Sequence, residues 1–192
     1  NREAELAFLR SQVNPHFLFN SLNNIYSLSY KKSDKAPEAI LKLSELIRYM
    51  LYEKHTTIPV SKEWEYIQNF ISLQQLRYDY PLKINLKSSG NLDGINIPPY
   101  LLIPFVENAF KHGDFTDDAF PLQIILIESG GQINFRVENK ISKQQKDSDG
   151  GIGLENVKRR LALIYPNNQQ LDINFTEQTF VIQLVINKNN GN

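Results

Sequence analysis

Hydrophobic side chains in the first eighty residues recur at the three- and four-residue spacing of amphipathic helices. The clearest pattern follows Pro37, a residue that suits a first helical turn. Its members are Ile40, Leu43, Ile47, Met50 and Leu51. An earlier pattern follows Asn14 and Pro15, which we interpret as an N-cap and the first helical residue. Its members are Leu18, Leu22 and Ile25.

A third helix is predicted from Ser61, an N-cap residue type, towards Arg77. Glu63 and Glu65 stand in its first turn, where carboxylates complement the positive end of the helix dipole. The short connection at residues 33–34 makes the first two helices an antiparallel hairpin. Two such helices leave much apolar surface uncovered, so we expect a symmetric dimer in which two hairpins form a four-helix bundle.

Downstream of residue 80 the pattern changes to the alternation of apolar and polar positions that is typical of strands. The alternating segments are residues 82–86, 122–127, 133–137, 171–175 and 180–186. The run Ser129-Gly130-Gly131 predicts a hairpin between two of them, and helical patterns cover residues 100–112 and 154–165. We therefore expect an α+β chain with two domains. Residues 1–80 form the helical domain, and residues 81–192 form an α/β sandwich whose mixed sheet is covered on one face.

Composition removes several classes of function. The chain has 192 residues with 21 basic and 21 acidic side chains, and this neutrality argues against a bulk nucleic-acid binder. The absence of cysteine excludes disulfides and thiolate chemistry. No apolar run reaches the ~18 residues needed to cross a bilayer. Because the sequence begins with Asn rather than Met, we expect a fragment whose natural protein continues upstream, into membrane segments.

The first segment with candidate chemistry is residues 14–20, which contain one of the three histidines. A histidine beside two phenylalanines is commonly a packed structural residue. The helical period, however, places His16 about 200° from Leu18 and its stripe, so the imidazole should face away from that stripe. A neutral imidazole nitrogen there could act as a nucleophile. Asn20, one turn later, could hydrogen-bond the ring or an incoming phosphate.

The second segment is residues 98–113. Asn108, Lys111 and His112 have the spacing that places them on one helix face. An amide oxygen can ligate Mg²⁺, and an ammonium group can bind a phosphate. Gly113 fits the position after the helix end. The spacing alone equally fits an ordinary solvated helix end.

The third segment is residues 150–161, in which glycines precede a helical pattern. Gly151 and Gly153 would let backbone N–H groups approach a phosphate at a helix N-terminus. Residues 140–160 hold six basic and three acidic side chains, which favours a polyanion. The polar stretch at residues 140–150 predicts a mobile loop. Loop flexibility and a solvated basic helix face are the plainer explanations.

Taken in this order, the three segments resemble the LytS/YehU-type sensor histidine kinases of bacterial two-component systems. Residues 14–20 resemble the phospho-acceptor region of that family, residues 101–113 its N box and residues 151–161 its second glycine box. The resemblance covers nearly the whole chain, and the ordered set is far more specific than any one segment. Residues 151–154 and 161–166 are similar to members from Bacteroidetes in particular.

The resemblance implies a dimerisation and histidine-phosphotransfer hairpin followed by a Bergerat-type (GHKL) ATP-binding domain. ATP with Mg²⁺ would phosphorylate His16, and the phosphoryl group would pass to an aspartate of a response regulator. The protein would be a homodimer, and the chain would be the cytoplasmic domain of an inner-membrane sensor. No nucleic-acid partner is expected.

The resemblance also implies roles for single residues. Asn108 corresponds to the Mg²⁺-binding asparagine, and Lys111 and His112 would contact phosphates. The backbone at Gly151 and Gly153 would close around the phosphates, with residues 140–150 as the ATP lid.

Two positions near these motifs depart from common patterns, and a third keeps the family's residue. Phe17 follows the phospho-acceptor where many histidine kinases have an acidic residue, so the general base is unassigned. Pro104 stands where many members of the wider ATPase superfamily have Glu or Asn. Glu107, the acid that the family places before the N-box asparagine, is present and is a catalytic candidate.

The largest departure is in the first glycine box. Residues 137–141 occupy the place of the usual Asp-x-Gly-x-Gly, without either glycine. Strand alternation puts Asn139 at the aspartate position, facing the same way as Val137. An asparagine oxygen can accept a hydrogen bond from the adenine amino group, but it has no charge.

Two alternatives follow from these departures. One is a non-catalytic dimeric signalling scaffold with a degenerate ATP site, favoured by Asn139 and the missing glycines. The other is an ATPase of the same fold without a histidine acceptor, which the complete motif around His16 argues against. His55 lies in no motif, and we interpret it as a surface or packing residue.

Overall fold

The computed structural model describes residues 15–53, 55–142 and 152–187. Within these ranges the chain divides into two compact units. Unit 1 comprises the residues up to Thr56 together with Trp64–Pro81, and unit 2 comprises Thr57–Glu63 and the residues from Leu82 onward. The division after Pro81 lies beside the expected boundary at residue 80, whereas residues 57–63 group with the downstream unit. The assignment of these units as domains remains a prediction.

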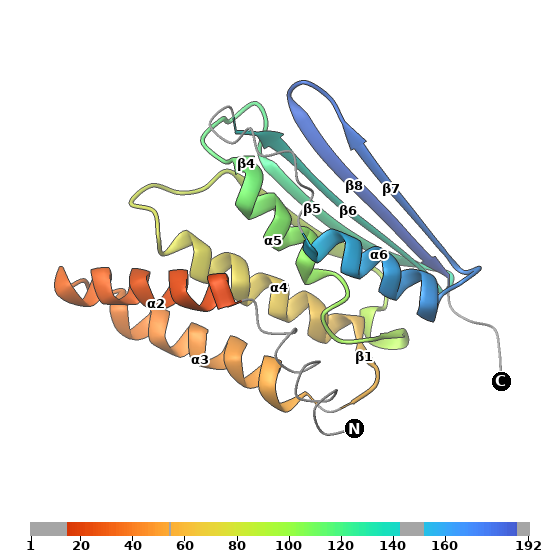
Figure 1. Ribbon diagram of the computed structural model, residues 1–192, viewed down its shortest axis with the longest axis horizontal. Helices are drawn as coiled ribbons and strands as arrows, with labels where there is room; N and C mark the ends of the chain where they lie inside the picture. The colour runs from red at the N-terminus through yellow and green to blue at the C-terminus, as the bar shows by residue number, and fades with distance from the viewer. Residues whose placement is uncertain (1–14, 54, 143–151, 188–192) are drawn as a thin grey trace. The chain divides into compact units, whose positions relative to one another are not determined.

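The described part of unit 1 is built from α2 (Pro15–Tyr30), α3 (Ala36–Tyr52) and the greater part of α4 (Val60–Gln75). The helix α2 is described from Pro15 onward, and the predicted N-cap Asn14 lies outside the described residues. It is connected to α3 by a turn in which the Ser33 N–H donates to the Leu28 oxygen at 2.9 Å. The two helices lie antiparallel and side by side (Figure 1), which confirms the predicted hairpin.

The buried face of α3 shares Leu43 and Met50 with the predicted stripe, but it includes other residues as well. Its buried members are Ala36, Ala39, Leu43, Leu46 and Met50. Ile40, which the stripe includes, is 53% exposed. Adjacent stripes share the same periodicity, so the spacing alone cannot choose between them. The helix that packs against α3 decides which stripe is buried. This partner is α4, and the ring centroids of Tyr49 on α3 and Tyr66 on α4 lie 4.7 Å apart.

The helix α2 also turns a different face inward from the predicted one. Phe17 is buried, and its ring centroid lies 5.2 Å from that of Phe70 on α4. Leu22, a member of the predicted stripe, is 48% exposed. Large apolar side chains therefore remain exposed on the hairpin. We call them the exposed apolar row: Phe19, Leu22, Tyr26 and Tyr30 on α2, and Ile40 and Leu41 on α3.

Unit 2 contains a mixed sheet with the strand order β2-β5-β6-β8-β7. The strands are β2 (Ile84–Ser89), β5 (Leu122–Ser129), β6 (Gln132–Ile141), β7 (Gln169–Phe175) and β8 (Thr179–Asn187). Among the strands of the described residues, β2 pairs with β5 in parallel, and the β5–β6, β6–β8 and β7–β8 pairings are antiparallel. A short strand, β4 (Gly113–Asp114), pairs with the end of β6. Two further short strands pair with each other, β1 (Ile58–Pro59) and β3 (Asn96–Ile97), and η1 (Leu92–Gly94) precedes β3.

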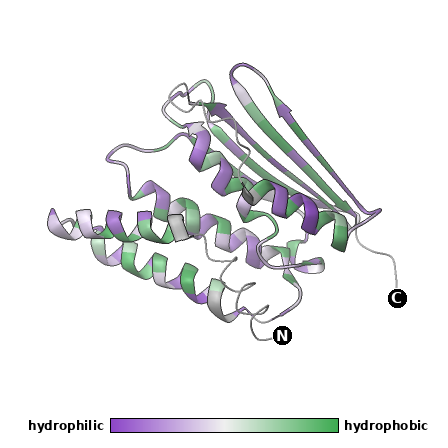
Figure 2. Ribbon diagram, in the orientation of Figure 1, coloured by the Kyte–Doolittle hydropathy of each residue, from purple (hydrophilic) through white to green (hydrophobic). Residues whose placement is uncertain are grey.

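The predicted hairpins and the one-sided cover of the sheet are confirmed. Gly130 and Gly131 have φ values of 59° and 82°, the left-handed conformations that a tight hairpin turn requires. The helices α5 (Ile103–His112) and α6 (Ile152–Ile164) cover one face of the sheet (Figure 1). Buried and less buried positions alternate along β6 and β8, and the hydropathy colouring of these strands alternates with them (Figure 2).

Two predicted helix starts differ from the structure. The helix α4 begins at Val60 rather than after Ser61, because the Ser61 hydroxyl donates to Asp93 and the Val60 N–H donates to the Ile95 oxygen. The helix α5 begins at Ile103 rather than at residue 100. Tyr100 has a φ of 60°, outside the helical region. Across the described ranges, no helix combines the length and apolar character that a membrane span requires.

Candidate nucleotide site

Most of the predicted nucleotide-binding residues belong to unit 2. The C-terminal end of α5 is joined to the end of β6 by main-chain bonds. The Ser142 N–H donates to the His112 oxygen at 3.0 Å, and Gly113 pairs with Ile141 in the β4–β6 ladder. Asn139 lies two residues before Ile141 on β6. The structure thus brings the end of the N-box helix beside the strand that carries Asn139.

The helix α5 turns an apolar face to the sheet and a polar face away from it. Phe105, Val106 and Ala109 are buried, and the ring centroid of Phe105 lies 6.2 Å from that of Phe135 on β6. Among the predicted site residues on this helix, Asn108 and His112 are half-buried and Lys111 is exposed. Glu107, the catalytic candidate beside Asn108, is half-buried.

Gly113 follows the end of α5, as predicted. Glycine is required there because a side chain would have no room, and not because the backbone is left-handed. Its φ is −84°, a value open to any residue. A Cβ built at this position would lie 2.5 Å from the Phe115 ring and 2.6 Å from the Ala109 oxygen. Phe115 in turn packs against Phe110, with ring centroids 4.9 Å apart. Glycine therefore lets the chain pass from α5 into β4 beneath an aromatic ring.

Asn139 is 1% exposed and points to the same side of the sheet as the buried Val137, as alternation predicts. Its Nδ2 donates to the Lys140 oxygen at 3.0 Å. Its Oδ1 is buried, and within the described structure it has no hydrogen-bond partner. Such an acceptor costs free energy unless a donor reaches it. A ligand amino group, such as that of adenine, fits this need.

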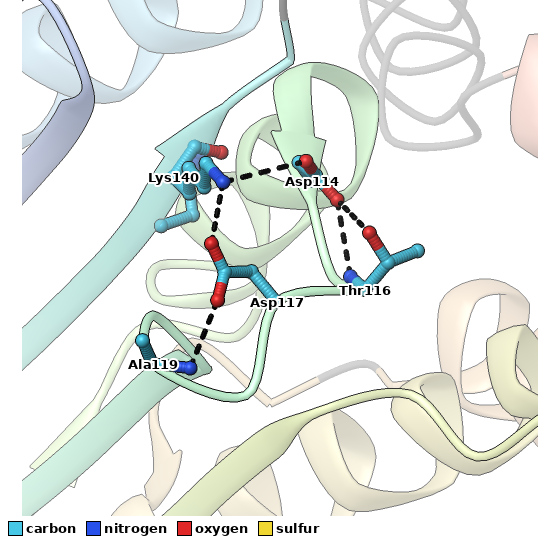
Figure 3. Close-up of polar contacts among 6 residues, drawn as sticks. Asp114, Thr116, Asp117, Ala119 and Lys140 are labelled. Atoms are coloured by element: carbon cyan, nitrogen blue, oxygen red, sulfur yellow. Dashed lines mark hydrogen bonds and ion pairs between the residues drawn. The ribbon is translucent and has the colours of Figure 1, made fainter.

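Sequence reasoning missed the ion cluster beside Asn139, which Figure 3 shows. Lys140 Nζ lies 2.5 Å from Asp117 Oδ2 and 3.9 Å from Asp114 Oδ2. Asp114 Oδ1 accepts from the Thr116 N–H and hydroxyl, and Asp117 Oδ1 accepts from the Ala119 N–H. The cluster fastens the loop after β4 onto β6. The sequence gives little sign of this cluster, because Asp117 and Lys140 are 23 positions apart and local patterns do not link them.

The same contacts shift the pKa values of the three charged groups. The Thr116 hydroxyl hydrogen bond is the main cause that lowers the pKa of Asp114. The hydrogen bond from Lys140 lowers the pKa of Asp117, and the same bond raises the pKa of Lys140. All three groups are therefore held in their charged forms beside the strand that carries Asn139.

Glu63 is a second residue whose role the sequence did not predict. The residue stands in the first turn of α4, as expected, but it is fully buried rather than a solvated partner of the helix dipole. Its carboxylate accepts hydrogen bonds from the backbone N–H groups of Tyr100, Leu102 and Ile103 at 2.9, 3.0 and 3.2 Å. These donors lie 37 to 40 positions away in sequence, which is why local patterns gave no sign of them.

The remaining predicted residues are placed only in part. His16 is the second residue of α2, and its side chain lies outside the described structure. Asn20, one turn later on α2, is half-buried. Both belong to unit 1. Gly153 is the second residue of α6, while Gly151 and most of the predicted lid lie outside the described residues.

A solved structure of a bacterial phosphotransferase is similar to this chain in fold. The TM-score is 0.55 at 10% sequence identity, and the match covers 93% of this chain and 94% of that one. At that identity the likeness concerns the fold alone. It agrees with the predicted arrangement of a helical unit followed by an α/β sandwich.

The sequence comparisons identify relatives over almost the whole chain. A family model described as histidine kinase matches residues 4–82. The sensor protein LytS of Staphylococcus saprophyticus is 32% identical over 92% of this chain, and that of Oceanobacillus iheyensis is 28% identical over 96%. The sensor histidine kinase/phosphatase LytS of Staphylococcus aureus is 32% identical over 91%. The chain spans about a third of the length of each relative, between 32% and 34%. The chain is therefore a homologue of the LytS-type sensor histidine kinases.

Proposed function

We propose that this chain is the catalytic core of a sensor histidine kinase. It uses ATP to phosphorylate His16, and the phosphoryl group then passes to an aspartate of a response regulator. The observation that carries the proposal is the buried, unpartnered Oδ1 of Asn139, which offers an acceptor to the adenine amino group despite the altered first glycine box. The homology to LytS proteins supports the same activity.

The residues around the end of α5 suit the rest of the nucleotide. The half-buried amide of Asn108 offers an oxygen ligand for Mg²⁺. Lys111 and His112, one turn later on the same helix, would contact the phosphate oxygens through their cationic and N–H groups. The backbone at Gly151 and Gly153 completes the phosphate site at the start of α6. When bound, Mg²⁺ neutralises charge on the phosphates.

Phosphoryl transfer follows from these assignments. A nitrogen of the His16 imidazole forms a bond to the γ-phosphorus while the bond to the β–γ bridging oxygen breaks, and ADP leaves. The attacking nitrogen is the unprotonated one, and the other ring nitrogen then releases its proton to solvent water, which leaves a neutral phosphohistidine. Asn20, one turn from His16, orients the ring or the transferred group. Glu107, which precedes the Mg²⁺-binding Asn108, is the carboxylate we place in the catalytic set.

The helical unit supplies the proposed partner surfaces. The exposed apolar row covers two helices with side chains as large as Tyr30, which is 80% exposed. Burying such a row against a second copy would give the four-helix dimer expected for the hairpin. A response regulator is the second proposed partner, because it receives the phosphoryl group. The natural protein is anchored in the membrane through segments upstream of this chain.

A non-catalytic scaffold is the second candidate function. The observation that favours it is the pairing of Ile141 with Gly113, which extends the β4–β6 ladder where the family has a glycine. Asn139 also lacks the charge of the usual aspartate. A scaffold would keep the dimer and its partner surface without using ATP.

Labelled ATP distinguishes the two functions. The parent protein with Mg²⁺ should acquire acid-labile label, and His16→Gln and Asn108→Ala should both abolish it. His55→Gln is the matched control, because His55 is exposed and pairs locally with Glu53. It should label like the parent protein. An absence of nucleotide binding at millimolar ATP would favour the scaffold, and label surviving His16→Gln would refute the acceptor assignment.

A further inference from the structure

The N-terminus of the N-box helix is held by a side chain from another helix. The first N–H groups of any helix lack partners within that helix. In α5, no side-chain cap bond is formed by Leu102, the N-cap residue. The Glu63 carboxylate acts as the cap instead. Its Oε1 accepts hydrogen bonds from the Leu102 and Ile103 N–H groups. Because these donors have no partner within their own helix and meet one buried side chain, the position of α5 depends on Glu63.

The same carboxylate stabilises an unusual backbone conformation just before the helix. Tyr100 has a φ of 60° although it is not a glycine, a conformation that persists only where the surroundings enforce it. Its N–H donates to Glu63 Oε2 at 2.9 Å, and its carbonyl oxygen accepts from Arg160 Nη1 at 3.3 Å. Both backbone polar groups of Tyr100 are thus held by side chains from α4 and α6.

The held segment leads directly into the proposed nucleotide site. Ile103 is the first residue of α5, and Asn108 follows five residues later on the same helix. A helix of this length moves as a rigid element, so a shift at Ile103 is carried to Asn108 and Lys111. Misplacement of a binding or reacting group by about 1 Å can cost on the order of a hundredfold in rate.

We infer that Glu63 is a positioning residue of the nucleotide site, which sets the place of Asn108 and Lys111 through the start of α5. This inference rests on the proposed function of that site. Glu63 is also the last residue of unit 2 before α4 continues into unit 1.

The test compares nucleotide affinity in Glu63→Gln, Glu63→Asp and the parent protein. Glutamine keeps the shape but turns an N–H₂ group towards part of the donor set, and aspartate keeps the charge but shortens the reach. Glu65→Gln is the matched control, since Glu65 lies two residues away on α4 and is exposed. Titration calorimetry with Mg²⁺ and a non-hydrolysable ATP analogue is carried out well below each unfolding midpoint, with circular dichroism to confirm folding.

A positioning role predicts that folded Glu63→Gln binds the analogue at least about tenfold more weakly, a shift that misplaced ligand groups readily produce, with Glu63→Asp intermediate and Glu65→Gln unchanged. Amide exchange of residues 100–103 should rise in the variants while β5 and β6 stay protected. Parent-like affinity in a folded Glu63→Gln protein would overturn the inference, as would unfolding of both Glu63 variants, because the carboxylate would then act in folding alone. A parent protein that binds no analogue would instead refute the proposed function.

Discussion

The side-chain nitrogen of Asn139 donates a hydrogen bond to the main-chain oxygen of Lys140, its neighbour on β6, at 3.0 Å. This bond fixes the orientation of the amide, so the buried Oδ1 is left as an acceptor. The position that usually carries an aspartate thus keeps its acceptor without keeping its charge. A ligand that presents an amino group satisfies it, whereas one that presents a carbonyl oxygen does not.

Base recognition should therefore depend on Asn139. Asn139→Ala should weaken binding of Mg²⁺ with an ATP analogue by up to about tenfold, the net value of one neutral hydrogen bond. The parent protein should bind the matching GTP analogue more weakly than the ATP analogue. Asn134→Ala is the control, since Asn134 lies on the same strand with its side chain on the opposite face. Equal affinities for the two analogues would contradict this role of Oδ1.

Gly113 should resist substitution because of its surroundings. Gly113→Ala places a methyl group against the Phe115 ring and the Ala109 oxygen, and overpacking of this kind costs about 1 to 3 kcal/mol. Thermal unfolding should show a lower midpoint. Gly130→Asn is a useful contrast, because that position is open and asparagine tolerates its left-handed φ. If both variants unfold at the same temperature as the parent protein, the close contact at Gly113 does not affect the free energy of unfolding.

The ion cluster makes stability depend on pH at both extremes. The pKa of Asp117 is lowered from its ordinary value of 3.8 by Lys140, so its contribution is present above that value and is lost as pH falls through the folded pKa. The pKa of Lys140 is raised from 10.5 by Asp117, so its contribution is present below 10.5 and is lost as pH rises through the folded pKa. Because these charges are largely solvated, the effect should be small.

The measurement is the unfolding midpoint of parent protein and Asp117→Asn from acid to alkaline pH. The difference between the two should be largest at neutral pH and should shrink towards both extremes. A difference that is constant with pH would show that the ion pair does not contribute.

The exposed apolar row should control association. Tyr26→Glu places a charge at a side chain that is 70% exposed on α2, and a buried unpaired charge in a dimer interface is costly. Sedimentation should show a dimeric parent and a more dissociated variant. Leu163→Glu is the control, since Leu163 is 75% exposed on α6 of unit 2. A parent that stays monomeric at high concentration would refute the four-helix arrangement.

Local patterns predicted the elements better than their contacts. Alternation and Gly130-Gly131 predicted the β5–β6 hairpin, because a hairpin turn depends on neighbouring residues. The predicted stripe of α3 was right at Leu43 and Met50 and wrong at Ile40, since Ala39 and Ile40 both fit the helical period and the partner helix decides between them.

In the candidate site, too, local patterns predicted the positions of residues but not their distant contacts. The motifs located Asn108 and Asn139 correctly on one helix face and one buried strand face. Glu63 and the pair of Asp117 with Lys140 were missed as contacts because their partners are distant in sequence. The positive φ of Tyr100 could not be predicted from neighbouring residues either. It is explained by distant side chains such as Glu63, which accepts a hydrogen bond from the Tyr100 N–H.

The central claim is that His16 accepts the phosphoryl group, and phosphopeptide mapping after reaction with Mg²⁺ and ATP tests it most directly. Peptides are separated at alkaline pH, where phosphohistidine survives, and each of the three histidines is scored. The account predicts a phosphoryl group on the peptide that contains His16 and none on those that contain His55 or His112. Phosphorylation of either other histidine, or none in a protein that binds the nucleotide, would contradict it.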